Sequence, residues 1–298
     1  MRSRRIRCTR WPARIGLTLA CHRWRTAMRL IRFLKPLKAT RNKGDLRMCE
    51  TDEMQWAERF FIHSEAVENA VVTLSLTELS LPANAEHLLI TYAAMLGTDD
   101  KRLAAAFFCS WYAGICGAKH ALLTAAHPMA HALCLSNMSV QLIRTEGFPM
   151  FSFHVHENRD DLCHKHGSVE ELLDELGLFY KNDVRPIILA LAEAAQVKAV
   201  MLWKQIYNQL YAYMEEDLEN AAGHNSGLII ERFKSMTWEL ESEVFGLRSN
   251  PFRIIPKFRT DPNPPHRSIS IKATCCLAYQ LRADHGYCSS CPILCRLE

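Results

Sequence analysis

The chain has 298 residues and 49% of them are apolar, so it can bury the core of one large domain or two modest ones. The formal charge of +4 hides an uneven distribution, because residues 1–47 hold 15 Lys and Arg against one acidic residue. No stretch approaches the roughly 20 apolar residues of a membrane-spanning helix, and no P-loop or Rossmann glycine pattern occurs, so we expect neither a transmembrane helix nor a nucleotide cofactor bound by such a motif.

Residues 1–47 form a basic leader whose apolar run, residues 15–21, is too short and interrupted for a good signal peptide. Three interpretations are open: a start codon assigned too far upstream, a basic amphipathic segment around residues 24–37 that touches anionic membrane, or a nucleic-acid tail. The abrupt change of composition near Met48 favours the first interpretation. We therefore expect no nucleic-acid partner, and membrane contact only at the periphery through this leader.

Residues 48–246 are expected to form a mainly helical body. Apolar residues recur there at three- and four-residue spacing, with capping residues at several starts. This pattern predicts helices over residues 51–71, 84–96, 100–126, 183–195, 197–219 and 228–244, and a further helix after a capping box at residues 168–171. Between them, near residues 132–156, apolar and polar residues alternate on both sides of a Gly147–Pro149 turn, which predicts a small β-hairpin.

Residues 247–298 combine a proline-rich connector with a cysteine-rich end. Cys288 and Cys291 form a C-x2-C pair, a spacing that lets one turn direct two thiolates at a metal centre. The adjacent Cys275 and Cys276 can both face such a centre only where the backbone bends or where the centre is large. A two-iron cluster suits them better than a single zinc ion, although a zinc site with four thiolates stays the alternative.

The pattern Cys-Cys, a spacer, then Cys-x2-Cys-Pro, with Tyr279 shortly after Cys276, resembles the C-terminal signature of the FhuF-type siderophore ferric reductases. The family pattern has ten residues in the spacer, whereas eleven separate Cys276 from Cys288 here. The resemblance implies that Cys275, Cys276, Cys288 and Cys291 ligate a [2Fe–2S] cluster and that Cys295 does not.

By the same resemblance the chain is expected to be a cytoplasmic ferric reductase. It would pass one electron from the cluster to ferric iron in a siderophore, most plausibly of the hydroxamate type, and would receive electrons from a separate donor protein or a reduced small donor. Two rival hypotheses stay open: a helical binding module clipped by zinc, and an iron–sulfur sensor or electron carrier without reductase activity.

Overall fold

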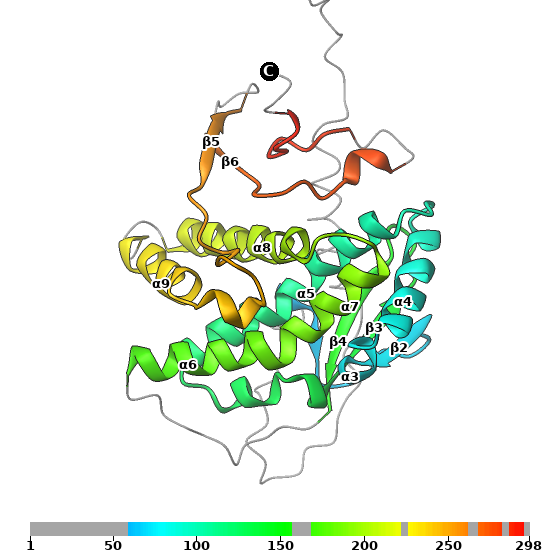
Figure 1. The fold of residues 1–298 in the computed structure, drawn as a ribbon, viewed down its shortest axis with the longest axis horizontal. Helices are drawn as coiled ribbons and strands as arrows, with labels where there is room; N and C mark the ends of the chain where they lie inside the picture. Colours follow the sequence, from blue (N-terminus) through cyan, green and yellow to red (C-terminus); the bar gives the residue numbers. More distant parts are fainter. Residues whose placement is uncertain (1–58, 157–167, 222–225, 262–267, 282–285, 295–298) are drawn as a thin grey trace, which may run out of the picture.

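The computed structural model describes residues 59–156, 168–221, 226–261, 268–281 and 286–294, and most of these residues are helical (Figure 1). The α-helices are α3 (Leu76–Leu79), α4 (Pro82–Met95), α5 (Lys101–Thr124), α6 (Val169–Phe179), α7 (Arg185–Ala194), α8 (Ala199–Asn220) and α9 (Ser226–Trp238). A π-helical turn, Tyr180–Val184, joins α6 to α7. The predicted class, mainly α with a small β component, is confirmed.

Helix α5 is the centre of the body, and its sequence explains why. Nearly all of its side chains are apolar and buried, and a helix that is apolar on every side must be surrounded by other elements. It packs along α8 and also contacts α4, α6 and α7. Gly114 lets the backbone of Phe60 cross α5 closely, because a Cβ at this glycine would overlap the Phe60 carbonyl oxygen.

A four-stranded sheet lies beside α4 and α5, with strands in the order β1 (Ile62–His63), β4 (Met150–Val155), β3 (Met138–Ile143) and β2 (Val72–Ser75). The predicted hairpin is confirmed as the antiparallel pair β3–β4, in which Val140 lies opposite Phe153 and Leu142 opposite Phe151. These four side chains are buried, and Phe108 of α5 contacts Phe151 edge to face at 4.9 Å between ring centroids. The alternation in the sequence is therefore the alternation between the two faces of the sheet.

The predicted helix over residues 51–71 is wrong in its described part. Strand β1 runs parallel to β4, with Ile62 opposite Phe153, and the Phe153 N–H donates to the carbonyl of Phe61 at 2.8 Å. Phe61 itself adopts a left-handed conformation, φ 60°, and packs edge to face on Trp111 of α5. Burial of this aromatic run between sheet and helix outweighs its local helical pattern. Residues 51–58 lie outside the described residues.

The remaining helix predictions agree with the structure to within a few residues at most ends. Asp100 caps α5 by accepting the Arg102 N–H, and Ser168 caps α6 by accepting the Glu171 N–H. The exception is α9, which ends at Trp238 rather than at residue 244.

The early end of α9 has a long-range cause. The side chain of Asn250 donates to the carbonyl oxygens of Thr237 and Leu240, each at 2.8 Å, and so takes up acceptors at the end of this helix. The chain then makes a 3₁₀ turn, Ser242–Phe245, and reverses at Gly246, which is left-handed as a helix-ending glycine often is.

The tail beyond Gly246 is more ordered than the predicted connector. It forms a two-stranded antiparallel ribbon, β5 (Lys257–Thr260) and β6 (Ser268–Ile271), and then crosses above α8 to the cysteine loops (Figure 1). The expected domain boundaries at residues 47 and 246 stay predictions. Among the described helices, none combines the length and the apolar character needed to cross a bilayer.

Candidate metal centre

Two amide side chains of α8 attach the first cysteine pair to the body. Asn208 accepts the Ala273 N–H at 2.8 Å and donates to the Thr274 carbonyl at 3.1 Å. Gln205, which is 1% exposed, donates to the Cys275 carbonyl at 2.6 Å. Asn208 also donates to the side-chain oxygen of Gln205, so the two amides form one network. This network sets the position of the backbone that carries the adjacent cysteines.

The backbone bends immediately after the adjacent cysteines. Leu277 is left-handed, with φ 64°, and begins a 3₁₀ turn, Ala278–Gln280. Its N–H donates to the Sγ of Cys275 at 3.3 Å. Side chains at successive positions of an extended strand point to opposite faces, yet Cys275 and Cys276 both line one hollow, and the chain forms no strand at these two residues.

The second cysteine pair is held by a tight turn. The Cys291 N–H donates to the Cys288 carbonyl at 2.9 Å, which closes the C-x2-C segment on itself. The Lys272 N–H donates to the Ser290 carbonyl at 3.0 Å and ties this turn to the end of β6. Cys291 is 2% exposed, so its thiol is directed inward rather than toward water.

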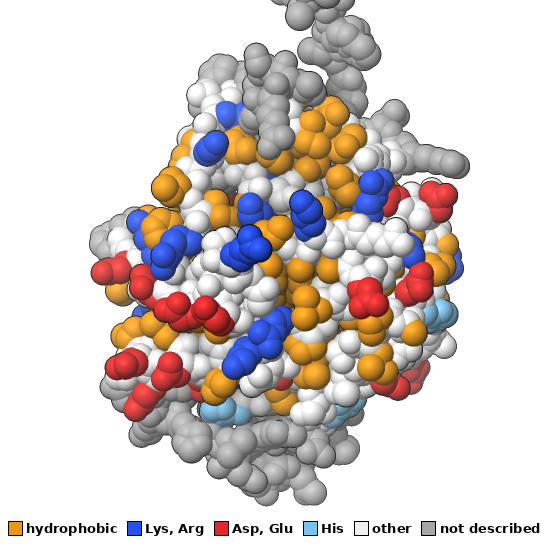
Figure 2. Space-filling model, in the orientation of Figure 1, with side chains coloured by type: hydrophobic (Ala, Val, Ile, Leu, Met, Phe, Trp, Pro, Cys, Tyr) orange, Lys and Arg blue, Asp and Glu red, His pale blue; other side chains and the backbone are white. Residues whose placement is uncertain are grey.

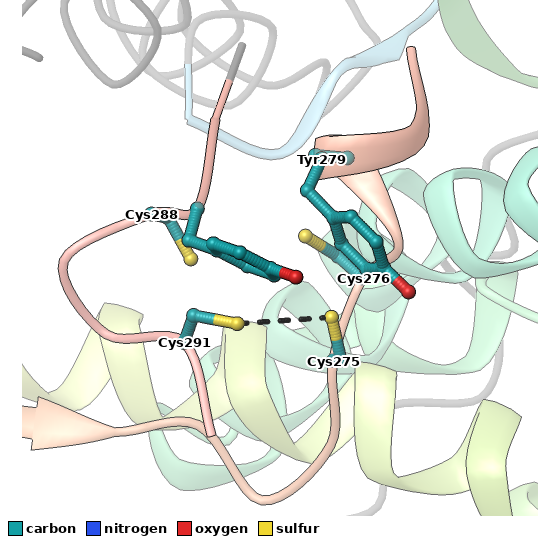
Figure 3. Close-up of a pocket in the computed structure, with 7 residues that line it drawn as sticks. Cys275, Cys276, Tyr279, Cys288 and Cys291 are labelled. Carbon is teal, nitrogen blue, oxygen red and sulfur yellow. Dashed lines mark hydrogen bonds between the residues drawn. The ribbon is translucent and has the colours of Figure 1, made fainter. Parts of the chain in front are cut away.

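The four cysteines meet in one hollow, which is lined by Cys275, Cys276, Ala278, Tyr279, Tyr287, Cys288 and Cys291. Figure 3 shows their thiol groups turned toward the same space. The Sγ atoms of Cys275 and Cys291 are 3.8 Å apart. Two sulfurs bound tetrahedrally to one metal at about 2.3 Å would lie about 3.8 Å from each other. This pair therefore already has the separation of two ligands on one metal atom.

The environment shifts the pKa of two of these thiols in opposite directions. The hydrogen bond from Cys276 lowers the pKa of Cys275, and the Leu277 N–H adds to this effect against the opposing effect of burial. The hydrogen bond between Cys276 and Cys288, together with burial, raises the pKa of Cys288, while the charge of Lys272 acts in the other direction. A metal must displace the thiol protons, so loading of this centre releases protons and depends on pH.

The donor set is made of soft sulfur atoms, which favour iron–sulfur clusters or zinc over hard cations. Within the described ranges, no three His, Cys, Asp or Glu side chains gather closely enough to hold a single metal ion. A [2Fe–2S] cluster requires two thiolates on each iron, and the four converging thiols fit this requirement. They are the residues that would hold such a cluster.

Two tyrosine rings complete the hollow. Tyr279 and Tyr287 stack with their ring centroids 4.7 Å apart and their planes at 30°. Both side chains are half-buried, so they cover part of the hollow while one side of the rings stays open to solvent. Tyr279 is the tyrosine that follows the adjacent cysteines in the sequence motif.

Sequence reasoning identified the cysteines but missed their supports. Gln205 and Asn208 lie beside Lys204 and Gln209 in a helix that carries polar residues at many positions, so no signal in the sequence distinguished them. The aromatic side chains of α8 are largely core, as expected from their spacing: Trp203, Tyr207 and Tyr213 are buried, and none lines the hollow. Cys295 lies outside the described residues.

Comparison with known proteins agrees with this geometry. Residues 273–292 match the family model of the FhuF 2Fe-2S C-terminal domain, a span that contains all four converging cysteines. No curated protein matches the chain. The resemblance in the cysteine pattern is thus confirmed for the tail, and the matched domain specifies a [2Fe–2S] cluster as cofactor rather than zinc. Over residues 273–292 the C-terminal segment of this chain is therefore similar to the FhuF 2Fe-2S C-terminal domain.

Proposed function

We propose that this chain reduces ferric iron in a siderophore complex by one electron and so releases Fe(II) in the cytoplasm. The observation that carries the proposal is the convergence of Cys275, Cys276, Cys288 and Cys291 in one hollow, within a segment that matches the FhuF 2Fe-2S domain. We assign these four side chains as the cluster ligands.

The chemistry of iron release explains why a one-electron carrier suits this task. Siderophores bind Fe(III) tightly because a small, hard cation matches their hard hydroxamate or catecholate oxygens. Fe(II) is held far less tightly by the same oxygens, so the transfer of one electron loosens the complex. A cluster supplies one electron at a potential tuned by hydrogen bonds to sulfur, by nearby charge and by solvent exposure. In this chain the Leu277 N–H on the Cys275 sulfur is one such hydrogen bond, which favours the reduced cluster.

The size of the hollow supports transfer to a substrate that stays outside it. It is lined by only seven residues, and four of these are the cysteines themselves. A four-atom cluster is small enough for such a space, whereas a ferric siderophore is not. The half-buried rings of Tyr279 and Tyr287 beside the cysteines offer the surface against which the complex would rest. A hydroxamate complex is the siderophore that we propose first.

A single-turnover experiment tests this function. The cluster-loaded protein is reduced with dithionite, freed of excess reductant and mixed anaerobically with ferric hydroxamate, catecholate or citrate complexes. We expect the oxidised cluster spectrum to return while an Fe(II) chelator traps one iron per cluster. If no complex reoxidises the protein, the reductase proposal fails, and an iron–sulfur sensor or electron carrier becomes the better explanation.

A further inference from the structure

Charge is divided sharply between the body and the tail that bears the cysteines. Residues 48–246 contain 13 Lys and Arg against 28 Asp and Glu, whereas residues 247–298 contain eight against three. Figure 2 shows one face of the molecule, on which Lys and Arg lie over the middle and upper part while Asp and Glu gather toward the lower left and the right. A basic surface on an acidic protein attracts an anionic partner to that surface and not to the remainder.

The β5–β6 ribbon adds exposed apolar side chains to this basic tail. Ile255 is 79% exposed and Phe258 is 58% exposed, and the exposed Lys257 lies between them in the chain. Surface-exposed aromatic and aliphatic side chains rimmed by basic ones are typical of protein interfaces. A ribbon of only two strands is also marginal in water and gains stability when another surface covers it.

Backbone connections join the ribbon directly to the cysteine hollow. Lys257 lies opposite Ile271 in the register, and the next residue, Lys272, donates its N–H to Ser290 between Cys288 and Cys291. A strand pair adds about 5 Å and each further step about 3–5 Å, so the Lys257–Ile271 end of the ribbon lies within about 15 Å of the hollow. A redox partner bound at the ribbon would bring its own cofactor near the cluster, and electron transfer depends steeply on that separation.

We infer that the β5–β6 ribbon and the chain next to it, residues 248–261 and 268–272, are the docking surface for a small acidic electron-carrier protein that donates single electrons to the cluster. The inference rests on the proposed function, and it specifies the class of protein that donates electrons to the cluster. One electron leaves the reduced carrier and enters the oxidised [2Fe–2S] centre, and the same electron later reduces Fe(III) to Fe(II). Basic and apolar side chains follow one another along β5, at Lys257, Phe258 and Arg259, and such a row suits a protein surface better than a single ferric chelate.

The test measures electron delivery to the cluster-loaded protein by stopped-flow absorption, with a reduced acidic plant-type [2Fe–2S] ferredoxin as the probe. Lys257→Glu should lower the second-order rate constant about tenfold at low ionic strength, and the difference should shrink as salt is added. Phe258→Ser should slow delivery at all salt concentrations, because it removes an apolar contact. Lys181→Glu, at an exposed position in the turn between α6 and α7, makes the same change of charge on the body and should leave the rate within about twofold.

Dithionite reduction separates this inference from the proposed function. All three variants should be reduced by dithionite at the wild-type rate and should still reduce a ferric siderophore, because neither step uses the ribbon. Equal slowing by Lys257→Glu and Lys181→Glu, a rate without salt dependence, or faster delivery from a basic carrier than from the acidic one would overturn the docking surface. Concentration-dependent self-association that Lys257→Glu abolishes would also overturn it, since a second copy would then occupy the ribbon.

Discussion

The contact between α8 and the cysteine tail can be tested through Asn208. This side chain accepts from the backbone of Ala273 and donates to that of Thr274, and its amide also supports Gln205. Asn208→Ala removes both bonds to the tail while it keeps α8 helical, because alanine is the best helix former. We expect the variant to fold normally but to hold the cluster less firmly.

The magnitude follows from the two lost hydrogen bonds. Each contributes about 0.5–1.5 kcal/mol, so their loss weakens the attachment of the tail by about 1–3 kcal/mol. If the tail must detach from α8 before iron escapes, each 1.4 kcal/mol speeds release about tenfold. Iron release should therefore accelerate by roughly five- to 100-fold.

The assay follows loss of the cluster absorption in the presence of excess chelator, without oxygen, alongside thermal unfolding of the body by circular dichroism. Asn220→Ala, at the exposed end of the same helix, is the matched control and should leave the release rate unchanged. Gln205→Ala combined with Asn208→Ala should be non-additive, because the two amides form one network. Release at the wild-type rate from Asn208→Ala would refute the idea that these amides hold the tail.

Three further outcomes are expected. Cys291→Ser should lose the visible absorption and iron of the cluster, whereas Cys295→Ser should keep both; bleaching of the second variant would mean that the ligand set is wrong. Gly114→Ala should cost about 1–3 kcal/mol in urea unfolding because its Cβ meets the backbone of the crossing chain. Gly147→Ala places its Cβ in open space, so its free energy of unfolding should stay within about 0.5 kcal/mol of the unsubstituted protein. An equal loss of stability in the two variants would contradict the explanation by backbone overlap. Burial lowers the pKa of His120 to about 3, below about 6.5 in the unfolded chain, so the unfolded state takes up a proton first as pH falls. The free energy of unfolding should then decline below pH 6.5 by up to about 1.4 kcal/mol per pH unit, and His120→Gln should make this decline less steep. An equally steep decline in the variant would mean that other groups cause it.

Much of the molecule follows from local patterns in the sequence. The caps at Asp100 and Ser168 mark helix starts because their side chains bond the nearest free backbone N–H groups. The alternation around Gly147 predicts the β3–β4 hairpin because apolar side chains occupy one face of each strand and mostly polar ones the other. The cysteine motif is also local, and it accounts for the similarity of residues 273–292 to the FhuF 2Fe-2S C-terminal domain and for the expected [2Fe–2S] cofactor.

Contacts between segments far apart in the sequence determined the features that local patterns did not predict. The helical pattern before residue 71 gave way to strand β1 because the sheet edge and α5 bury Phe61 and Ile62 better than a helix would. The end of α9 depends on Asn250, which no pattern within the helix announces. Nor does spacing show that the Sγ atoms of Cys275 and Cys291 lie 3.8 Å apart.

The sequence by itself therefore determined which residues can bind the cluster and which segments are helical, because those properties depend on side-chain chemistry and on neighbours three or four positions away. Only the tertiary structure decided how the tail is attached, through Gln205 and Asn208, and that all four cysteines line one hollow. These contacts join residues about 65–70 positions apart, and their free energy comes from burial and hydrogen bonds that exist only once the chain has folded.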